Sequence, residues 1–301
     1  MHIDRVTWGG WENCIRLQND HIELVITTEL GPRIISCGRP GGKNLFHVDD
    51  ATRGKNGGED WWLYGGHRLW HAPEDPVRTY QPDNSPVTVE TLSDTQTRFE
   101  TPTEAMSGIQ KTITITLRDD GKTTVHHTLT NHGAWPLEFA VWSLSVMAPG
   151  STAILPLPSR GEHPRDLLPN TRLIFWPYAD LSDKRWTLGY EYILLRQETT
   201  GLPQKVGGLV DRGWLACANN GDLFVKWFDC DTQAPYPDMG CNAELFTNTN
   251  FLELESLGPI MTVEPGASIS HTETWRVFAG VPVPTSDDDV RTHILPLIES
   301  V

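Results

Sequence analysis

The alternation of apolar and polar residues along much of the chain predicts β-strands. It is clearest in Gln110–Arg118 (Q-K-T-I-T-I-T-L-R), where three apolar side chains at every second position fall on one face of an extended strand. Asp119-Asp120-Gly121 has the residue types of a hairpin turn, and Thr124–Asn131 then alternates in the same way. The sequence therefore predicts an antiparallel hairpin in this part of the chain.

Other short apolar runs are bounded by Gly, Pro and Asn, which is typical of strands joined by turns. We expect further strands at Ile22–Thr28, Arg33–Cys37, Asn44–Val48, Val87–Glu90, Thr95–Thr101, Trp135–Met147, Arg172–Trp176, Tyr192–Gln197, Trp214–Ala218, Leu223–Phe228, Glu244–Thr247, Asn250–Glu255, Ile260–Val263 and Ser268–Phe278. So many short strands without an internal repeat predict an all-β fold, a large two-sheet antiparallel sandwich.

Only the C-terminal tail predicts a helix. Thr285–Asp289 (T-S-D-D-D) offers an N-cap and acidic residues for the first turn, an apolar face follows from Val290, and Pro296 ends or kinks the helix. We expect residues 1–301 to form one domain in which residues 285–301 are a helical tail.

The charge of the chain limits the partners that it is expected to bind. Its 301 residues carry 24 Lys and Arg against 39 Asp and Glu, a formal charge of −15 with a pI of about 5.1. An acidic protein is a poor general partner for nucleic acid or for an anionic membrane, but it can bind a neutral small molecule. The sequence has no apolar run of membrane-spanning length, and nothing in it indicates an oligomeric state.

The N-terminus and the cysteines favour a cytoplasmic protein. Met1–Arg5 lacks the apolar stretch of a secretory signal, and the five cysteines form no C-x-x-C pair. We therefore expect reduced thiols in the cytoplasm.

One stretch, Tyr64–Glu74 (Y-G-G-H-R-L-W-H-A-P-E), concentrates side chains that can move protons and hold a polar ligand. Its glycines and its Ala-Pro step argue against a regular helix. The candidates are two histidines, an arginine, a tryptophan and a glutamate: His67, Arg68, Trp70, His71 and Glu74. Tryptophan, of which the chain has twelve, offers a flat amphipathic surface suited to a sugar ring. The alternative is that the histidines are structural and that the arginine is buried beside a carboxylate.

A second stretch, Phe251–Glu255 (F-L-E-L-E), carries two carboxylates. In a strand, its leucines lie on one face and Glu253 and Glu255 on the other, roughly 6–7 Å apart along the backbone. The pair lies either on a solvated outer face or on the floor of a cleft. In a cleft, one glutamate could act as a general base, because like charges in close proximity raise the pKa of at least one carboxyl.

A third stretch, Asp229–Glu244, contains a rigid turn with an aromatic and two polar side chains that suit a sugar: Tyr236, Asp238 and Asn242. The alternative is an ordinary turn in which Asp and Asn bond their own backbone.

No metal or cofactor is predicted. His67 and His71 are four residues apart on a segment that Pro73 interrupts, so they lack the geometry of a helical metal-binding pair. The sequence has neither a G-x-x-x-x-G-K-[ST] loop for nucleotides nor a G-x-S-x-G motif.

Two blocks together, Tyr64–Glu74 and Phe251–Trp275, resemble the galactose mutarotase-like superfamily, the aldose 1-epimerases and their relatives. The first is similar to a G-G-x-x-x-x-x-P segment of the sugar-phosphate mutarotase branch. The second is similar to the late strand that ends on the catalytic glutamate, followed by a P-G turn and a last long strand. The resemblance covers about Asn19–Phe278 and looks most like a bacterial branch distinct from the standard galactose mutarotases.

The resemblance implies a large two-sheet β-supersandwich that binds a small-molecule sugar or oligosaccharide in a cleft on its concave sheet, with no cofactor. It implies that Glu255 is the general base and that Arg68 lies near the substrate with His67 or His71. One feature departs from the family, which usually has its general-acid histidine in the middle strand pair. Here Phe139–Ser145 reads F-A-V-W-S-L-S.

Three functions therefore remain open. The first is an aldose mutarotase that interconverts sugar anomers by acid–base ring opening, in which His71, His67 or Tyr236 replaces the missing histidine as the acid. In it, the residues expected around the sugar are Arg68, Trp70, Glu74, Tyr236, Asp238, Asn242 and Glu253. The second is a non-catalytic glycan-binding or regulatory protein on the same fold, and the third is a polysaccharide lyase or hydrolase.

Overall fold

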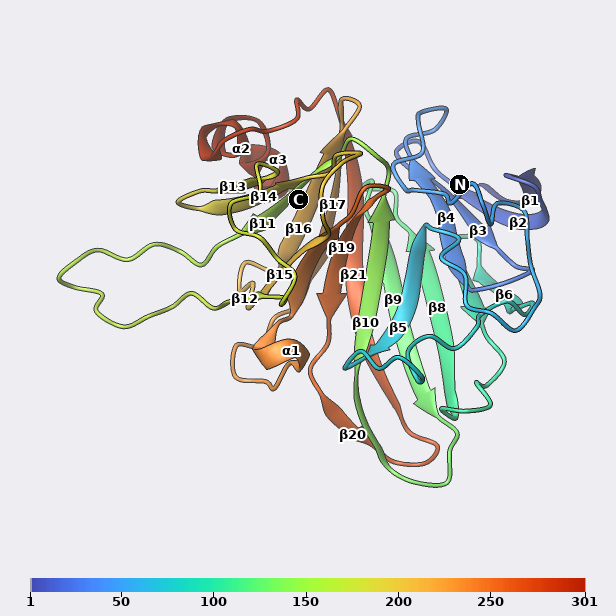
Figure 1. Cartoon of the computed structure of the whole chain (residues 1–301). Coiled ribbons are helices and arrows are strands. Elements are labelled where there is room, and N and C mark those ends of the chain that lie inside the picture. The colour runs from blue at the N-terminus through green and yellow to red at the C-terminus, as the bar shows by residue number, and fades with distance from the viewer. Residues whose placement is uncertain (1, 301) are drawn as a thin grey trace.

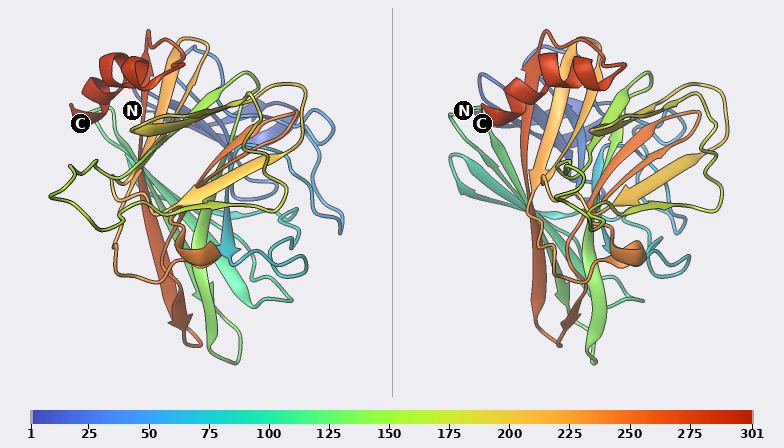
Figure 2. Two further views of the ribbon diagram at one scale, coloured as in Figure 1. Left: turned by 60° about the vertical axis from the view of Figure 1, so that its left-hand side comes forward. Right: turned by 90° about the vertical axis from the view of Figure 1, so that its left-hand side faces the viewer.

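The computed structural model of the chain describes residues 2–300 and consists mainly of two antiparallel β-sheets packed against each other (Figure 1). The predicted all-β, two-sheet fold is thus confirmed. Two further views show the same two layers from the side, with the C-terminal helices at one end (Figure 2).

The first sheet has the strand order β1-β2-β3-β4-β5-β10-β19-β18-β15-β12, and β20 pairs with β10. Its strands are β1 (His2–Trp8), β2 (Trp11–Gln18), β3 (Glu23–Thr27), β4 (Arg33–Gly38), β5 (His67–Ala72), β10 (Leu137–Met147), β12 (Leu173–Phe175), β15 (Gln204–Gly208), β18 (Ala243–Thr247), β19 (Leu252–Leu257) and β20 (Met261–Val263).

The second sheet has the order β13-β14-β11-β16-β17-β21-β9-β8-β7-β6. Its strands are β6 (Thr88–Ser93), β7 (Gln96–Glu100), β8 (Ile109–Leu117), β9 (Thr123–Asn131), β11 (Thr152–Pro156), β13 (Trp186–Leu188), β14 (Tyr192–Arg196), β16 (Trp214–Asn219), β17 (Asp222–Phe228) and β21 (Ser268–Ala279).

The main core lies between the sheets and follows the alternation seen in the sequence. In β9, every second residue is buried, and Val125 and Leu129 belong to this core. The strand pairs with β8 as the predicted hairpin, whose turn contains Gly121 at φ 81°. Because side chains alternate across a strand, each strand of the first sheet also presents a second row of residues away from this core.

One predicted strand is wrong. Asn44–Val48 forms only isolated bridges, at Phe46 and Val48. The side chain of Asn44 accepts a hydrogen bond from the backbone N–H of Cys37 at 2.9 Å, and the backbone N–H of Leu45 donates to the carbonyl of Cys37 at 2.8 Å, so the segment makes single hydrogen bonds to β4 instead of a continuous ladder.

The tail is helical, as predicted, but it forms two short helices, α2 (Asp287–His293) and α3 (Leu295–Glu299). The hydroxyl of Ser286 caps α2 by accepting a hydrogen bond from the N–H of Asp289, and Pro296 lies in the first turn of α3. Both helices bury apolar residues on the outer side of the second sheet. The remaining helix, α1 (Pro237–Gly240), is a single turn. None of the helices in residues 2–300 is long and apolar enough to cross a membrane.

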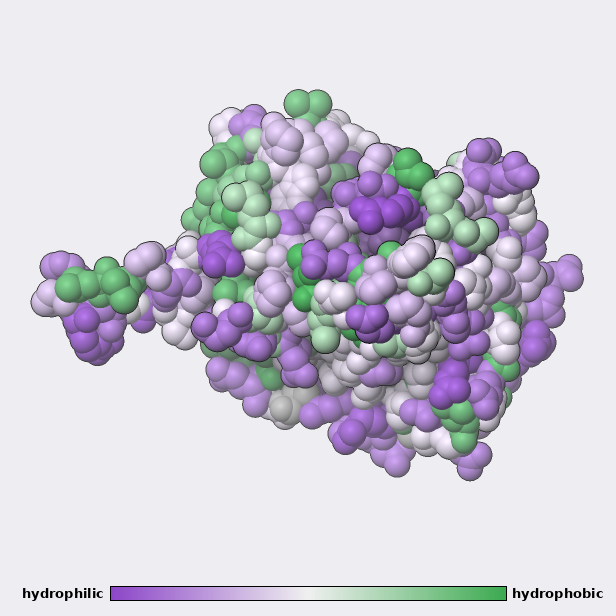
Figure 3. All heavy atoms as spheres, turned by 90° about the horizontal axis from the view of Figure 1, so that it is seen from below, coloured by the Kyte–Doolittle hydropathy of each residue, from purple (hydrophilic) through white to green (hydrophobic). Residues whose placement is uncertain are grey.

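The connection between β11 and β12, residues 157–172, projects from the body as a long arm (Figures 1 and 3). Leu167 and Leu168 are exposed near its tip, where they form an apolar spot on a mostly polar surface (Figure 3).

Candidate functional site

A cavity of about 280 Å³ lies on the face of the first sheet that points away from the second sheet. Strands β5, β10, β19, β18 and β15 form its floor, and the segments before β5 and after β12 contribute to its walls. Its lining residues are Trp61, Leu63, Arg68, Trp70, Glu74, Tyr80, Trp142, Leu144, Tyr178, Lys205, Phe246, Asn248, Phe251 and Glu253.

Strand β5 divides the Tyr64–Glu74 motif between two environments. Arg68 and Trp70 line the cavity, whereas the alternate residues His67 and His71 point into the space between the sheets. His67 stacks edge-on against Trp275 of the second sheet, with ring centres 4.7 Å apart. The geometry therefore does not support either histidine as the acid of a reaction in this cavity.

His71 is buried without serving the cavity. Its ring packs against Phe139 of the main core, and burial, with a smaller contribution from Lys111, lowers the pKa of His71 to about 4. The imidazole is consequently neutral at physiological pH.

Arg68 and Glu253 form a buried ion pair on the cavity floor, with Nη2 and Oε1 2.9 Å apart. The guanidinium also lies 4.3 Å from the ring centre of Trp70. Its Nε and Nη1 are buried and have no hydrogen-bond partner in residues 2–300. Burial raises the pKa of Glu253, and Arg68 partly opposes this rise.

Aromatic rings build one wall of the cavity. Trp70 contacts Tyr80 and Trp142, with ring centres 5.0 and 5.4 Å apart, and Trp61 packs against both Trp70 and Tyr80. The indole N–H of Trp61 is buried without a partner in the described part of the chain. The wall thus combines apolar ring faces with a free donor, as a sugar site requires.

Lys205 lies at the opposite side of the floor, between two carboxylates. Its Nζ is 2.7 Å from Oε2 of Glu244 and 3.0 Å from Oε2 of Glu255, and all three side chains are nearly or completely buried. Burial alone would lower the pKa of Lys205, but the two carboxylates outweigh it and hold the pKa well above its ordinary value. Lys205 is therefore a cation that faces the cavity.

The two glutamates of β19 lie on one face of the strand, as its periodicity predicts, and this is the face that carries the cavity, but the two side chains differ in their access to it. Glu253 lines the cavity, whereas Glu255 is completely buried beneath Trp142 and Lys205. The indole N–H of Trp142 donates a hydrogen bond to Oε2 of Glu255 at 2.9 Å, while Oε1 has no partner among residues 2–300.

The third predicted stretch contributes little to the cavity. Tyr236 and Asn242 are buried and serve the backbone: Tyr236 accepts a hydrogen bond from the N–H of Asp231, and Asn242 bonds both polar backbone groups of Val210. Asp238 lies near Glu244 instead, and burial raises the pKa of Asp238. The alternative of a structural turn therefore describes Tyr236 and Asn242 better.

Glu74 stands at the rim of the cavity, where its carboxylate accepts a hydrogen bond from the hydroxyl of Tyr80. Burial and this contact raise the pKa of Tyr80. The carboxylate that pairs with Arg68 is Glu253.

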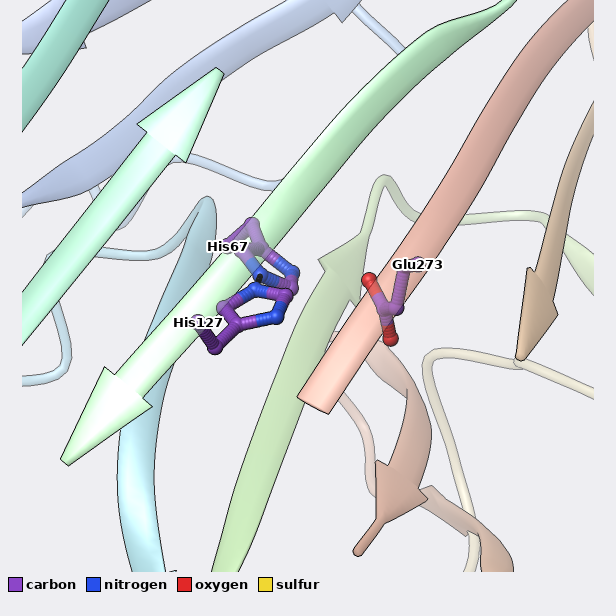
Figure 4. A group of neighbouring side chains, drawn as sticks. All are labelled: His67, His127 and Glu273. Atoms are coloured by element: carbon purple, nitrogen blue, oxygen red, sulfur yellow. Dashed lines mark hydrogen bonds between the residues drawn. The ribbon is translucent and has the colours of Figure 1, made fainter. Parts of the chain in front are cut away.

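Behind the cavity floor, His67, His127 and Glu273 meet between the sheets (Figure 4). The backbone carbonyl of His271 accepts from Nδ1 of His127, so Nε2 of His127 must accept from Nε2 of His67, 2.8 Å away. Burial lowers the pKa of His67 well below its ordinary value and that of His127 to about 4.

This cluster is not built as a metal site. Two imidazoles on one tetrahedral zinc would place their nitrogens roughly 3.3 Å apart, because each Zn–N bond is ~2.0 Å, whereas these nitrogens are at hydrogen-bond distance. Glu273 is engaged by the cation of Lys226 at 2.8 Å and accepts hydrogen bonds from Ser143, Ser256 and Trp275. The described atoms satisfy one another without an ion.

Several residues that line the cavity were not predicted from the sequence, among them Trp61, Tyr80, Trp142, Tyr178, Lys205 and Phe246. Glu244, which pairs with Lys205, was not predicted either. A signal existed for Lys205, which stands alone between Gln204 and an apolar V-G-G run in a short strand. A lysine in such a strand either faces solvent or is buried beside an acid. Only the strand order reveals that β15 lies next to β18 and its Glu244.

No protein-family model matches this sequence, and no curated protein matches it. Several solved structures, however, superpose on this chain. A galactose mutarotase-like protein from Lactobacillus casei superposes with a TM-score of 0.60 at 14% identity, covering 88% of this chain and 100% of the other.

Two further solved structures superpose on this chain over most of its length. A galactose mutarotase-like protein from Clostridium acetobutylicum gives a TM-score of 0.53 at 11% identity, covering 92% of this chain and 98% of the other. A candidate aldose 1-epimerase from Escherichia coli K12 gives 0.52 at 14% identity, with coverage of 89% and 99%. The two stacked sheets and these superpositions together show that this chain has the galactose mutarotase-like fold.

Proposed function

We propose that the chain binds a neutral sugar ring in the cavity of the first sheet and catalyses the exchange of its anomers. The observation that carries the proposal is the arrangement of Arg68, Glu253 and Lys205 on one floor beside a wall of aromatic rings. A carboxylate and a cation facing the same cavity are the minimum that acid–base opening of a sugar ring requires. The names of the structural neighbours support the same class of reaction.

In this mechanism, Glu253 takes the proton of the anomeric hydroxyl, and Lys205 donates a proton to the ring oxygen. The ring then opens, the carbonyl carbon turns, and the ring closes on its other face as both protons return. Arg68 holds Glu253 in place through their ion pair. Burial favours the role of Glu253, because a carboxyl with a raised pKa is a better base near neutral pH.

This assignment replaces the one suggested by the sequence. Glu255 was expected to be the base, but it is buried behind Lys205, whereas Glu253 is exposed to the cavity. We assign to Glu255 the task of fixing the ammonium group of Lys205, which it contacts at 3.0 Å.

The charges of the cavity favour a neutral sugar over a phosphorylated or acidic one. Of the described residues that line it, the cations are Arg68 and Lys205, and each is already paired with at least one carboxylate. An added phosphate or uronate would meet Glu253 and Glu74 without an unpaired positive charge. This pairing also argues against a lyase that uses Arg68 to neutralise a uronate.

The test is exchange NMR of anomeric protons over a panel of neutral, phosphorylated and acidic sugars. We expect catalysed exchange with a neutral sugar, a loss of about 10²–10⁴-fold in Glu253→Gln, and wild-type rates in the matched control Glu138→Gln, which alters an exposed carboxylate on β10. An active Glu253→Gln with an inactive Glu255→Gln would return the role of base to Glu255.

A second candidate is a non-catalytic sugar-binding protein. No histidine in residues 2–300 lines the cavity, and β10 has none where the family's acid is expected. This alternative predicts saturable binding of a neutral sugar by calorimetry, abolished by Arg68→Ala, with no catalysed exchange for any sugar of the panel.

A further inference from the structure

The group of Lys205, Glu244 and Glu255 contains one more carboxyl than its single cation can neutralise. The lysine contacts both carboxyls, at 2.7 and 3.0 Å, and neither glutamate has any solvent exposure. If all three groups were charged, a net negative charge would be buried in the cavity floor. Such a charge is strongly unfavourable, and a buried group normally takes up a proton instead.

Among residues 2–300, the other cation near this group is Arg172, which donates to the backbone carbonyl of Gly240 on α1 and forms no ion pair with either glutamate. A Cβ atom on Gly207 would lie 3.1 Å from Cγ of Glu244 and 2.7 Å from Sγ of Cys241, so the space beside Glu244 is already filled. The other ionisable neighbour of Glu244 is Asp238 on α1, which adds negative charge, and the thiol of Cys241 has a raised pKa and stays neutral.

The two carboxyls are not equivalent. Glu255 accepts hydrogen bonds from Lys205 and from the indole of Trp142, which both stabilise a carboxylate. Glu244 contacts Lys205 and lies beside the acidic Asp238, and neither of its carboxyl oxygens has a hydrogen-bond partner of regular geometry within residues 2–300.

We propose that Glu244 is protonated at neutral pH and stores a proton for Lys205. The triad then consists of a neutral Glu244, a cationic Lys205 and an anionic Glu255. Burial, with Glu255 and Asp238 as further causes, raises the pKa of Glu244 well above its ordinary value, which agrees with this assignment.

A neutral Glu244 no longer adds its charge to that of Glu255 in holding the proton on Lys205, so the ammonium group is a better donor than it would be beside two carboxylates. The use of this proton in catalysis rests on the proposed function. When the ammonium group of Lys205 passes a proton to the ring oxygen, it becomes a neutral amine. Glu244 gives its proton to that amine and becomes a carboxylate, so the ammonium is restored. On ring closure, the proton returns through Lys205 to Glu244. Glu244 touches no substrate and acts only through Lys205.

The protonation state can be tested without any substrate by infrared spectroscopy of the full chain. We expect a carbonyl band of a protonated carboxyl at neutral pH that disappears in Glu244→Gln and persists in Glu253→Gln and in the control Glu138→Gln. In Glu255→Gln, one cation faces one carboxyl, so Glu244 should ionise and the band should also disappear. A wild-type spectrum without the band, or a band that persists in Glu244→Gln, would overturn the proposal.

The relay is tested by kinetics on a sugar that shows exchange. We expect Glu244→Gln to lower kcat about 10²-fold and leave KM unchanged, with a pH profile that no longer shows the titration of this carboxyl. An unchanged kcat would overturn the relay. If the infrared band behaves as expected but the wild type catalyses anomer exchange of no sugar, the protonation of Glu244 is confirmed and the proposed catalysis is wrong.

Discussion

The ion pair of Lys226 and Glu273 between the sheets offers a quantitative test of what holds the cleft strands in place. Both side chains are completely buried, and their charged atoms are 2.8 Å apart. Lys226 on β17 also donates to the backbone carbonyls of Ser143 on β10 and Leu254 on β19, at 3.3 and 2.8 Å. One ammonium group thus joins the second sheet to two strands that carry the cavity floor.

Replacing the lysine by methionine keeps most of its volume but removes the charge and three contacts. Glu273 would keep its hydrogen bonds from Ser143, Ser256 and Trp275, yet its charge would lose its only contacting cation among residues 2–300. Removing one partner of a buried pair costs about 3–5 kcal/mol. For a chain of this length, the entropy of unfolding converts this cost into a decrease in Tm of about 5–8 °C.

The assay is chemical unfolding followed by tryptophan fluorescence, with Tm measured by calorimetry. The matched control is Lys184→Met, at an exposed lysine, for which we expect no measurable change. The double variant Lys226→Met/Glu273→Gln should be more stable than Lys226→Met alone, because no charge is then buried without a partner. A free energy of unfolding within about 1 kcal/mol of wild type in Lys226→Met would refute the reasoning.

Two further predictions concern the histidines and the aromatic wall. The pKa of His127 falls from 6.5 to about 4 on folding. Between these pH values the unfolded chain therefore binds more protons than the folded chain. The contribution of His127 to stability is complete above pH 6.5 and is lost as the pH falls toward 4. Between pH 7 and 5, the free energy of unfolding should decrease by about 2 kcal/mol more in the wild type than in His127→Asn. Denaturant titration at both pH values measures this difference. Equal decreases in the two proteins would contradict the burial of a neutral imidazole. Trp70→Ala should weaken sugar binding about tenfold in calorimetry, because it removes an aromatic surface of the cavity. The control Trp135→Ala, at an exposed tryptophan, should bind with the affinity of the wild type. Equal affinities of the two variants would show that the aromatic wall does not bind the sugar.

Much of the fold could be predicted from the sequence because strand periodicity is a local property. The alternation in β8 and β9 gave their inward faces and the hairpin between them, and Thr285–Asp289 marked the start of α2. Asn44–Val48 has an apolar run like that of a strand, but its backbone forms only isolated bridges.

The candidate site was only half predictable, and β5 shows why. The sequence correctly identified the motif, and a strand places His67 and Arg68 on opposite faces. Which face opens to the cavity is decided by where the second sheet packs, and it packs on the histidine side. The two histidines expected as acids therefore lie between the sheets, while Arg68 and Trp70 line the cavity.

The sequence by itself determined many of the strands, though not β1, β2, β5, β11, β13 or β15. It also determined their amphipathic faces, the helical tail and the presence of two carboxylates on one side of β19. Only the tertiary structure decided that Glu253 meets Arg68 from 185 residues away, and that Lys205 of β15 neutralises Glu255 across β18. The physical reason is that periodicity depends on neighbours in the chain, whereas burial and charge pairing depend on strand order. Strand order is fixed by the packing of the whole sandwich, which no local pattern encodes.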